Sequence, residues 1–470
     1  MRVKFILPAL AEARAEYYRR IKYSLFPPLG LATLAAYLDD GDDASIVDEH
    51  VETLDCSDAP DLVAIETYVT SARRAYEIAD IYRARGSYVV MGGLHVTALP
   101  DEALAHADTI VTGPAEEAWP RFLADFRARR AARVYRSSKR TLAGAPSPRR
   151  DLINRRNYLA PNSMVVSRGC PHSCDFCYKS SFYAGGPSFY TCNPEAALTE
   201  IEAMPGRHLF FLDDNIFADP PFAAALFAGM RGMGRVWQGA ATVQSILNSG
   251  LLDAAVACGM RSLFVGFESL SQDGMLRHGK RHNNVGDYSR AIRALHERGV
   301  MINGSFIFGL DSDDENVFDT TTDWAVANGI ETSTFHILTP YPGTPLFERL
   351  SSQERILHRN WEHYDTRHAV FKHPSMSRET IEKGYWRSYK RFYNWPNILK
   401  SAAAEPSLLR AARHVAYTGA WKKLDPLWTV LVKCGLLGLA MRPLEYTLRG
   451  RQATGSHPSQ PSTAHQPIPT

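Results

Sequence analysis

The chain has 470 residues, with 53 Lys and Arg against 50 Asp and Glu, and seven cysteines. The near-neutral charge gives no overall argument for a nucleic-acid partner or a membrane surface, and an odd cysteine count with three close together argues against a secreted disulfide framework. The length predicts two or three domains. The sequence contains no apolar run of about 18 residues, the length that a membrane-spanning helix needs. We therefore expect a cytoplasmic protein.

Residues 1–130 alternate short apolar runs with stretches of helical apolar spacing, a pattern that predicts a parallel sheet covered by helices. The expected strands are 3–7, 45–48, 62–66, 88–91 and 109–111, and the expected helices are 29–38, 71–85, 101–106 and 115–129. Ligands of such sheets bind at the carboxyl ends of the strands. There the sequence places Thr67, Gly92, Gly93, Gly113 and Glu116.

Each pair of glycines alone is explained as well by an ordinary turn. Together, however, segments 27–32, 91–100 and 111–116 resemble the cobalamin-binding domain that precedes many radical S-adenosylmethionine (SAM) domains. The resemblance implies that those five residues contact cobalamin. The motif Asp-x-His-x-x-Gly, which supplies a histidine to cobalt, is missing after the first strand. Asp48 and His50 imitate it after the second strand, but Thr53 replaces the glycine. We therefore expect His50 to be a solvated loop residue and not a cobalt ligand.

Residues 131–160 are rich in Arg, Ser and Pro and are expected to be a solvated linker. An RNA-binding patch is disfavoured because stacking aromatics are not interleaved with the basic residues.

Residues 161–350 repeat strand and helix about six times, which predicts a partial barrel with its chemistry at the carboxyl ends of the strands. The expected strands are 164–167, 209–212, 236–243, 262–267, 302–308 and 334–338, and the expected helices are 194–204, 221–230, 251–258, 285–298 and 316–328.

Cys170, Cys174 and Cys177 follow the first of these strands with the spacing C-x3-C-x2-C. Thiolates this close usually share a metal or a cluster. One alternative is a zinc site with His172 as fourth ligand, and another is three unrelated cysteines. The spacing, with Phe176 before the last cysteine, resembles the signature of the radical SAM superfamily. The resemblance implies a [4Fe–4S] cluster on the three cysteines, with SAM chelating the open iron and yielding a 5′-deoxyadenosyl radical.

Further segments at the strand ends resemble the SAM-binding parts of that superfamily. Asp213 and Asp214 lie where relatives hold the SAM ammonium, although a helix cap is the alternative. Glu268 and Ser269 resemble the motif near the ribose and carboxylate. Gln244 is a weaker candidate that a solvated strand end explains as well. Phe176 and Ile307 would offer backbone groups to adenine. Since Cys56, Cys192, Cys258 and Cys434 are scattered, we expect one cluster only and buried thiols elsewhere.

Residues 351–449 are expected to be helical, with a helix opened by Ser377 and Glu379 and running to Tyr393. Its aromatic stripe either packs against the core or walls a substrate pocket. Residues 426–441 are expected to form a buried or interfacial helix, with membrane-surface contact not favoured. Residues 450–470 are expected to be a disordered tail.

The sequence thus predicts an α/β protein: a Rossmann-like cobalamin domain, a partial (β/α)6 radical SAM barrel and a helical C-terminal region. The resemblance implies methylation of an unactivated carbon of a small biosynthetic substrate. One SAM methylates cobalamin, a second produces the radical, and an electron donor such as flavodoxin or ferredoxin reduces the cluster. Oxidative cyclases and rearrangement enzymes share these domains and remain the alternative, and a cobalamin or redox sensor is the non-enzymatic one. No residue that deprotonates the substrate can be assigned.

Overall fold

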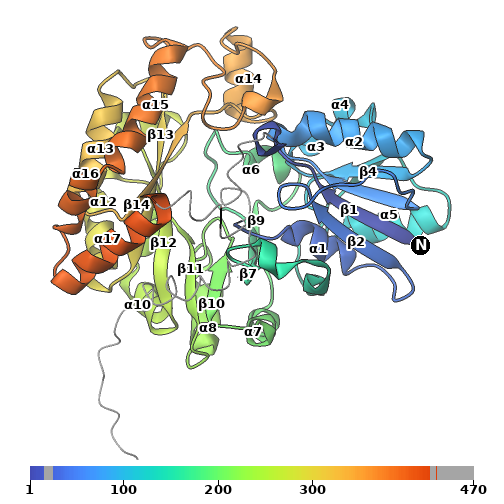
Figure 1. Ribbon diagram of the computed structural model, residues 1–470, viewed down its shortest axis with the longest axis horizontal. Helices are drawn as coiled ribbons and strands as arrows, with labels where there is room; N and C mark the ends of the chain where they lie inside the picture. The colour runs from blue at the N-terminus through green and yellow to red at the C-terminus, as the bar shows by residue number, and fades with distance from the viewer. Residues whose placement is uncertain (15–24, 424–429, 431–470) are drawn as a thin grey trace, which may run out of the picture.

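The computed structural model describes residues 1–14, 25–423 and 430, and it contains two six-stranded sheets, both parallel throughout (Figure 1). The first sheet lies in the N-terminal part, and the second curves into the open barrel that follows it. Cofactor sites in both kinds of sheet belong at the carboxyl ends of the strands.

The first sheet has the strand order β2-β1-β3-β4-β5-β6. Its strands are β1 (Arg2–Leu7), β2 (Asp43–Asp48), β3 (Leu62–Glu66), β4 (Tyr88–Gly92), β5 (Thr109–Thr112) and β6 (Val134–Arg136). All five expected strands are confirmed. The sixth, β6, was not predicted and comes from the range expected to be linker. The order reverses between β1 and β3, which creates a crevice at the carboxyl edge.

Helices cover both faces of this sheet (Figure 1). They are η1 (Ala11–Arg14), α1 (Leu29–Ala35), η3 (Val69–Ser71), α2 (Ala72–Ala84), α3 (Leu94–Ala98), α4 (Pro100–Leu104) and α5 (Ala118–Arg127). One core packs α1 and α5 on the sheet through residues such as Leu31 and Trp119. The other core packs α2, α3 and α4 through residues such as Ile78 and Val96. Because β3 is buried on both faces, it is a continuous apolar run.

The second sheet has the order β14-β13-β12-β11-β10-β7 and confirms the expected six-unit partial barrel. Its strands are β7 (Ser163–Met164), β10 (His208–Phe211), β11 (Val236–Ala241), β12 (Met260–Glu268), β13 (Met301–Phe308) and β14 (Thr332–Ile337). The helices on its outer face are α7 (Pro194–Ala203), α8 (Pro220–Met230), α9 (Val243–Ile246), α10 (Ser249–Ala257), α11 (Gln272–Arg277), η6 (Val285–Asp287), α12 (Tyr288–Glu297) and α13 (Val317–Ala327).

The linker and the first loop of the barrel form further short elements. The linker contributes η4 (Arg150–Leu152) and η5 (Arg155–Asn157). The expected strand 164–167 is divided between β7 and β8 (Ser167–Gly169), and β8 pairs antiparallel with β9 (Phe189–Thr191), which was not predicted. The short helix α6 (Lys179–Phe182) lies between the two strands of this hairpin in the chain. In Figure 1 it stands between the two sheets.

The C-terminal elements are α14 (Pro345–Ser352), η7 (Trp361–His363), α15 (Arg378–Phe392), α16 (Trp395–Ala402) and α17 (Leu408–Lys423). The helix expected after Ser377 is confirmed, since the Ser377 hydroxyl accepts the Thr380 N–H at 3.1 Å. Within the described ranges no helix is both long and apolar enough to cross a bilayer. The expectations for 426–441, 450–470 and Cys434 fall outside the described residues.

Two side-chain contacts at separate places attach the N-terminal part to the rest of the chain. In the first, the linker residue Tyr158 donates its hydroxyl to Asp48 at 3.0 Å. In the second, the indole N–H of Trp361 lies 3.2 Å from a carboxylate oxygen of Glu102 on α4. The carboxyl edges of both sheets are therefore held close to one another.

Candidate functional site

The cysteine loop leaves the hairpin strand β8 and lies at the carboxyl end of the barrel. Cys170, Cys174 and Cys177 are all partly buried, and the Cys177 N–H bonds the Cys174 carbonyl at 3.1 Å. Burial raises the pKa of the Cys174 thiol to about 12. A thiol in this environment ionises only when a bound metal stabilises the thiolate, so the loop fits a cluster better than a set of isolated thiolates.

The geometry of the loop disfavours the zinc alternative. Zinc binds sulfur at about 2.3 Å, so its four ligand atoms lie within about 4 Å of each other. Among the described residues, the one group of three potential ligand atoms that lie within 4.8 Å of one another is His296, Glu331 and Glu405, near the amino ends of the barrel strands. His172 instead stacks on His282, with ring centroids 3.5 Å apart.

The two aspartates after β10 are both held by the chain itself. Asp213 is buried, and it accepts the backbone N–H of Ser167 at 2.5 Å and that of Val166 at 3.1 Å. Burial raises its pKa to about 6. Asp214 pairs with Lys179 at 2.9 Å. Asp213 therefore anchors the start of the cysteine loop, and a SAM contact by either carboxylate stays a prediction.

Glu268 stands at the carboxyl end of β12 in a strained conformation. Its φ of 65° lies in the left-handed region, which costs a non-glycine residue about 1–3 kcal/mol. A register shift against β13 occurs at the same point, and bulges of this kind redirect side chains. The carboxylate forms a short ion pair with buried Lys280, which sequence reasoning missed. Ser269 is buried, and its hydroxyl accepts the Ser271 N–H at 3.0 Å.

The residues expected near adenine divide into two groups. Phe176 and Ile307 both pack against one apolar cluster that includes Leu310 and Leu338, so the fold brings them together at the barrel mouth. Gln244 is exposed on the short helix α9. Its role as a SAM contact stays a prediction.

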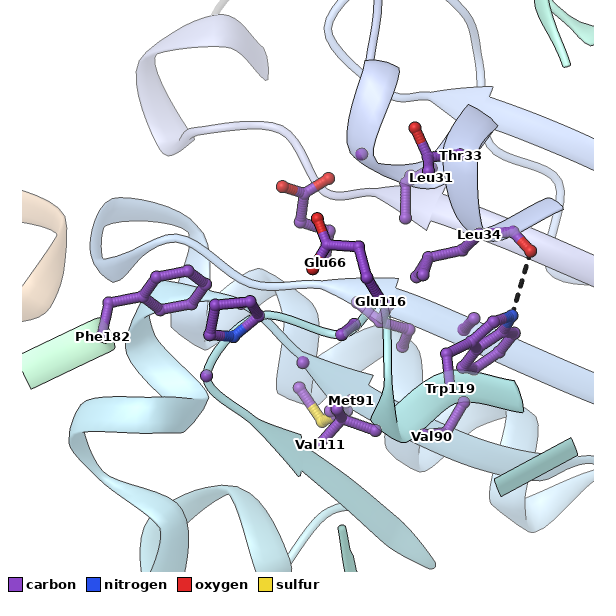
Figure 2. Close-up of a pocket in the computed structure, with 18 of the residues that line it drawn as sticks. Leu31, Thr33, Leu34, Glu66, Val90, Met91, Val111, Glu116, Trp119 and Phe182 are labelled. Carbon is purple, nitrogen blue, oxygen red and sulfur yellow. Dashed lines mark hydrogen bonds between the residues drawn. The ribbon is translucent and has the colours of Figure 1, made fainter. Parts of the chain in front are cut away.

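Four of the five cobalamin candidates gather around a cavity at the carboxyl edge of the first sheet (Figure 2). Gly92, Gly93, Gly113 and Glu116 line it. Figure 2 shows the carboxylates of Glu66 and Glu116 near each other, Leu31 and Leu34 of α1 on one side, and Phe182 of α6 on the other. The cavity thus opens between the first sheet and the segment that carries the cysteines, and its apolar walls and glycines fit a bulky ring ligand.

The structure shows why glycine is needed at residue 93 and how Thr67 and Glu116 are placed. Gly93 has φ 105°, and a Cβ there would lie 2.8 Å from the Thr67 carbonyl oxygen. Thr67 is fully buried, and its hydroxyl has no hydrogen-bond partner among the described residues. Glu116 points at Arg168 of β8, with Nε and Oε1 3.0 Å apart.

The expectation of a solvated His50 is wrong. Its side chain is only 11% exposed, and its Nδ1 lies 2.8 Å from the Asp48 carboxylate. Its Nε2 lies 3.4 Å from the Leu10 backbone nitrogen. His50 therefore closes the turn after β2.

A second cavity lies between the first sheet, the cysteine segment and β14. Its walls are rich in aromatic hydroxyls, contributed by Tyr68, Tyr178, Tyr341, Tyr364, Tyr385 and Tyr389. The sequence predicted that the aromatic residues along α15 either pack against the core or wall a substrate pocket. Two of them, Tyr385 and Tyr389, do line this cavity. His336 of β14 also lines it, and burial lowers its pKa below the usual value. Its place near a strand end was the signal that sequence reasoning overlooked.

Comparisons with known proteins agree with this geometry. Residues 23–123 match the B12 binding domain, residues 164–325 the radical SAM superfamily, and residues 344–444 a domain of unknown function, DUF4070. The chain is 30% identical over 392 residues to bacteriochlorophyllide d C-12(1)-methyltransferase of Chlorobaculum tepidum, covering 81% of this chain and 85% of that protein. It is 28% identical to the C-8(2)-methyltransferase of the same organism, over 77% and 85% of the two chains.

Among solved structures, OxsB, a cobalamin-dependent SAM radical enzyme with aqua-cobalamin and SAM bound, matches with a TM-score of 0.67 at 13% identity. The match covers 96% of this chain and 76% of that one.

Two domains in this order define the class of protein, a cobalamin-dependent radical SAM enzyme. The chain belongs to the cobalamin-binding radical SAM family, and within it to the methyltransferases that act on carbon. Its cofactors are a [4Fe–4S] cluster, SAM and cobalamin.

Proposed function

We propose that this enzyme methylates an unactivated carbon of a flat, largely apolar ring system held in the tyrosine-lined cavity. The observation that carries the proposal is the position of this cavity, which touches the edge of the first sheet, the cysteine segment and the barrel mouth at once. A tetrapyrrole is the first substrate to test, because both of these relatives are named as bacteriochlorophyllide methyltransferases.

The proposed cofactor ligands follow the sequence assignments. Cys170, Cys174 and Cys177 would hold the cluster. The SAM contacts would be Phe176, Asp213, Asp214, Gln244, Glu268, Ser269 and Ile307, with Lys280 holding the Glu268 carboxylate in place. The cobalamin contacts would be Thr67, Gly92, Gly93, Gly113 and Glu116. When bound, these groups supply a carbon-centred radical that removes a hydrogen atom and a methyl group that replaces it.

The chain's own contribution is to orient the substrate and exclude water. Tyr389 is fixed because its oxygen accepts the Phe335 N–H at 3.1 Å. The Nδ1 atom of His336 lies 3.2 Å from the Thr366 hydroxyl, which leaves Nε2 to contact a polar substituent of the substrate. Because burial lowers its pKa, His336 would be neutral at pH 7 and would offer a hydrogen bond without a charge.

We place the enzyme in the cytoplasm, with a flavodoxin or ferredoxin as electron donor. Support comes from the cysteine usage, because cysteines that must stay reduced to bind a cluster need a reducing compartment. The cluster must receive one electron for each SAM that is cleaved.

The test is anaerobic reconstitution with cobalamin, followed by reaction with methyl-labelled SAM, dithionite and a bacteriochlorophyllide. We expect S-adenosylhomocysteine, 5′-deoxyadenosine and a labelled product. 5′-Deoxyadenosine and a changed pigment without S-adenosylhomocysteine would contradict methylation and favour the cyclase alternative.

A matched pair of variants tests the cavity. Tyr385 lines it, whereas the adjacent Trp386 is 51% exposed. Tyr385→Leu should reduce labelled product while SAM cleavage without substrate is unchanged. Trp386→Leu should leave both unchanged. Equal effects of the two substitutions on product would place the substrate elsewhere.

A further inference from the structure

Arg168 and Glu116 join the cysteine segment to the cobalamin cavity. Arg168 lies on β8 and Glu116 follows β5, and their Nε and Oε1 atoms are 3.0 Å apart. The Arg168 side chain is 27% exposed and that of Glu116 is 12% exposed. Other titratable groups also lie near the guanidinium, namely Tyr37, Glu66, Tyr68, Tyr183 and Tyr190. A half-buried pair of opposite charges with direct hydrogen-bond contact holds its geometry well.

The path from Arg168 to the cysteine loop is short and rigid. Gly169, between Arg168 and Cys170, has φ 78°, and a Cβ there would lie 1.9 Å from the Ser188 carbonyl oxygen. That carbonyl also accepts the Cys170 N–H at 3.0 Å. The backbone between Arg168 and Cys170 is therefore held against Ser188, beside the β8–β9 hairpin.

The other side of Arg168 is fixed to the barrel. Ser167, the residue before it, donates its N–H to Asp213 at 2.5 Å. Asp213 thus acts on the cysteine loop through the backbone. The segment is held by the barrel through Asp213, by the hairpin through Ser188, and by the first sheet through Glu116.

A second contact brings the same two parts together. Gly113, just after the end of β5, has φ 73°, and a Cβ there would lie 3.3 Å from the Phe182 carbonyl oxygen on α6. The Gly113 N–H donates to the Thr97 hydroxyl at 2.9 Å. The loop that carries Glu116 therefore lies against the cysteine segment without room for a side chain.

We propose that the Arg168–Glu116 ion pair is a positioning element that sets the placement of the cobalamin site relative to the cysteine loop. The inference rests on the proposed cluster ligands, and Arg168 acts through the loop and the cavity wall, touching no reacting atom. The proposed cluster and SAM contacts all lie in the barrel and the cysteine segment, so SAM cleavage should not need the first sheet. Methyl donation from SAM to cobalamin needs the two sites at the correct relative position. Loss of the ion pair should therefore slow methyl donation while leaving SAM cleavage at the cluster intact.

The test uses Arg168→Met in the reconstituted holoenzyme with SAM and dithionite and no substrate. 5′-Deoxyadenosine formation should stay within about twofold of wild type, whereas S-adenosylhomocysteine formation should fall about 10- to 100-fold, the effect of a misplacement of about 1 Å. Iron and cobalt contents should be unchanged. Pulsed EPR between Co(II) and the reduced cluster should show a broader distance distribution.

Arg150→Met is the matched control. Arg150 pairs with Glu200 at 2.6 Å with similar burial, but away from both cavities. It should lower stability without changing the ratio of the two products. Glu116→Gln should reproduce the loss of S-adenosylhomocysteine, and the double variant with Arg168→Met should add little, because each change breaks the same contact.

A parallel fall of both products, a loss of bound cobalt, or an unchanged distance distribution would overturn the positioning role. If the wild type itself releases no S-adenosylhomocysteine, the methyl-transfer proposal fails, and the width of the EPR distribution alone decides on the ion pair.

Discussion

The two sheets have the same number of strands and the same parallel direction, but opposite relations to solvent and ligands. In the first sheet β3 is buried at four successive residues, on both faces. In the second, β14 alternates, with Thr334 and His336 half-buried on one face and Phe335 and Ile337 buried on the other. A sheet covered on both sides accepts a ligand only at its edge, whereas a curved sheet also offers its inner face.

Polar side chains lie on the inner face of the barrel even at the amino ends of the strands. A cavity there is lined by apolar residues such as Phe210 and Phe264 and by one polar side chain from each of five strands, His208, Gln238, Ser262, Asn303 and Thr332. The barrel therefore differs from a barrel filled with branched apolar residues. Four substitutions test this contrast between the first sheet, which helices cover on both faces, and the barrel, whose inner face borders cavities. They are described from the largest expected effect on activity or stability to the smallest.

The largest effect on activity is expected at the mouth of the barrel. Cys174→Ala should abolish 5′-deoxyadenosine formation from SAM, because two thiolates cannot hold the cluster. The control is Cys258→Ala, at a buried thiol that donates to the Ala255 carbonyl on α10. It should cost stability and leave SAM cleavage intact. Retained cleavage in Cys174→Ala would refute the cluster assignment.

The second change breaks the edge of the covered sheet. Gly93→Ala places a Cβ 2.8 Å from a backbone oxygen at φ 105°, and should lower the free energy of unfolding by about 2–4 kcal/mol. Cobalamin content should fall with it. Gly86→Ala, at φ 83° with open space around it, should cost only about 1 kcal/mol. Urea denaturation measures both, and equal losses would mean that the close approach to Thr67 is unimportant.

The third change tests the polar inner face by pH. Burial lowers the pKa of His208 to about 4, so the unfolded chain binds more protons than the folded one between about pH 4 and 6.5. This contribution to stability is fully present above about pH 6.5 and is lost as the pH falls towards about 4, by up to about 3 kcal/mol.

Asp213 acts in the opposite sense, because burial raises its pKa to about 6 and stability is lost as the pH rises from about 4 to 6. The difference between wild type and His208→Gln isolates the histidine. This difference in unfolding free energy should grow with pH up to about 6.5 and then stay constant. A difference independent of pH would mean that His208 is hydrated.

The smallest effect on stability is expected where α15 packs against the barrel strand β14. Tyr389→Phe removes the oxygen that accepts the Phe335 N–H and should cost about 1 kcal/mol. Tyr393→Phe removes a similar contact to the Ser333 N–H at 2.9 Å and should cost the same. Of these two tyrosines Tyr389 lines the cavity, so its variant alone should also weaken substrate binding. Equal substrate affinities would argue against the tyrosine wall.

Long periodic segments were predictable from the sequence, and short or long-range features were not. The five apolar strands of the first sheet and the last five of the barrel are visible because burial repeats along each of them, whereas the expected strand 164–167 is divided between β7 and β8. The three-residue strands β6 and β9 are too short for a period to show. The helix after Ser377 was predictable from its cap, but the pattern did not show that Tyr385 and Tyr389 line a cavity while Ile381 packs inside.

In the candidate site, too, local features could be predicted from the sequence and long-range contacts could not. The cysteine spacing is local and could be read directly. The direction of a side chain at a strand end depends on residues far along the chain. Asp213 turns to the backbone of Ser167, and Glu116 turns to Arg168, 52 residues away. No local pattern encodes such pairs.

The contact between Trp361 and Glu102 gives the N-terminal part an attachment besides the linker and the Arg168–Glu116 pair. A body hinged at one point can rotate, whereas a body fixed at several separate points cannot turn about any one of them without releasing the others. The spacing between the two cavities is therefore insensitive to the length of the linker, and insertions near Gly144, whose surroundings are open, should be tolerated.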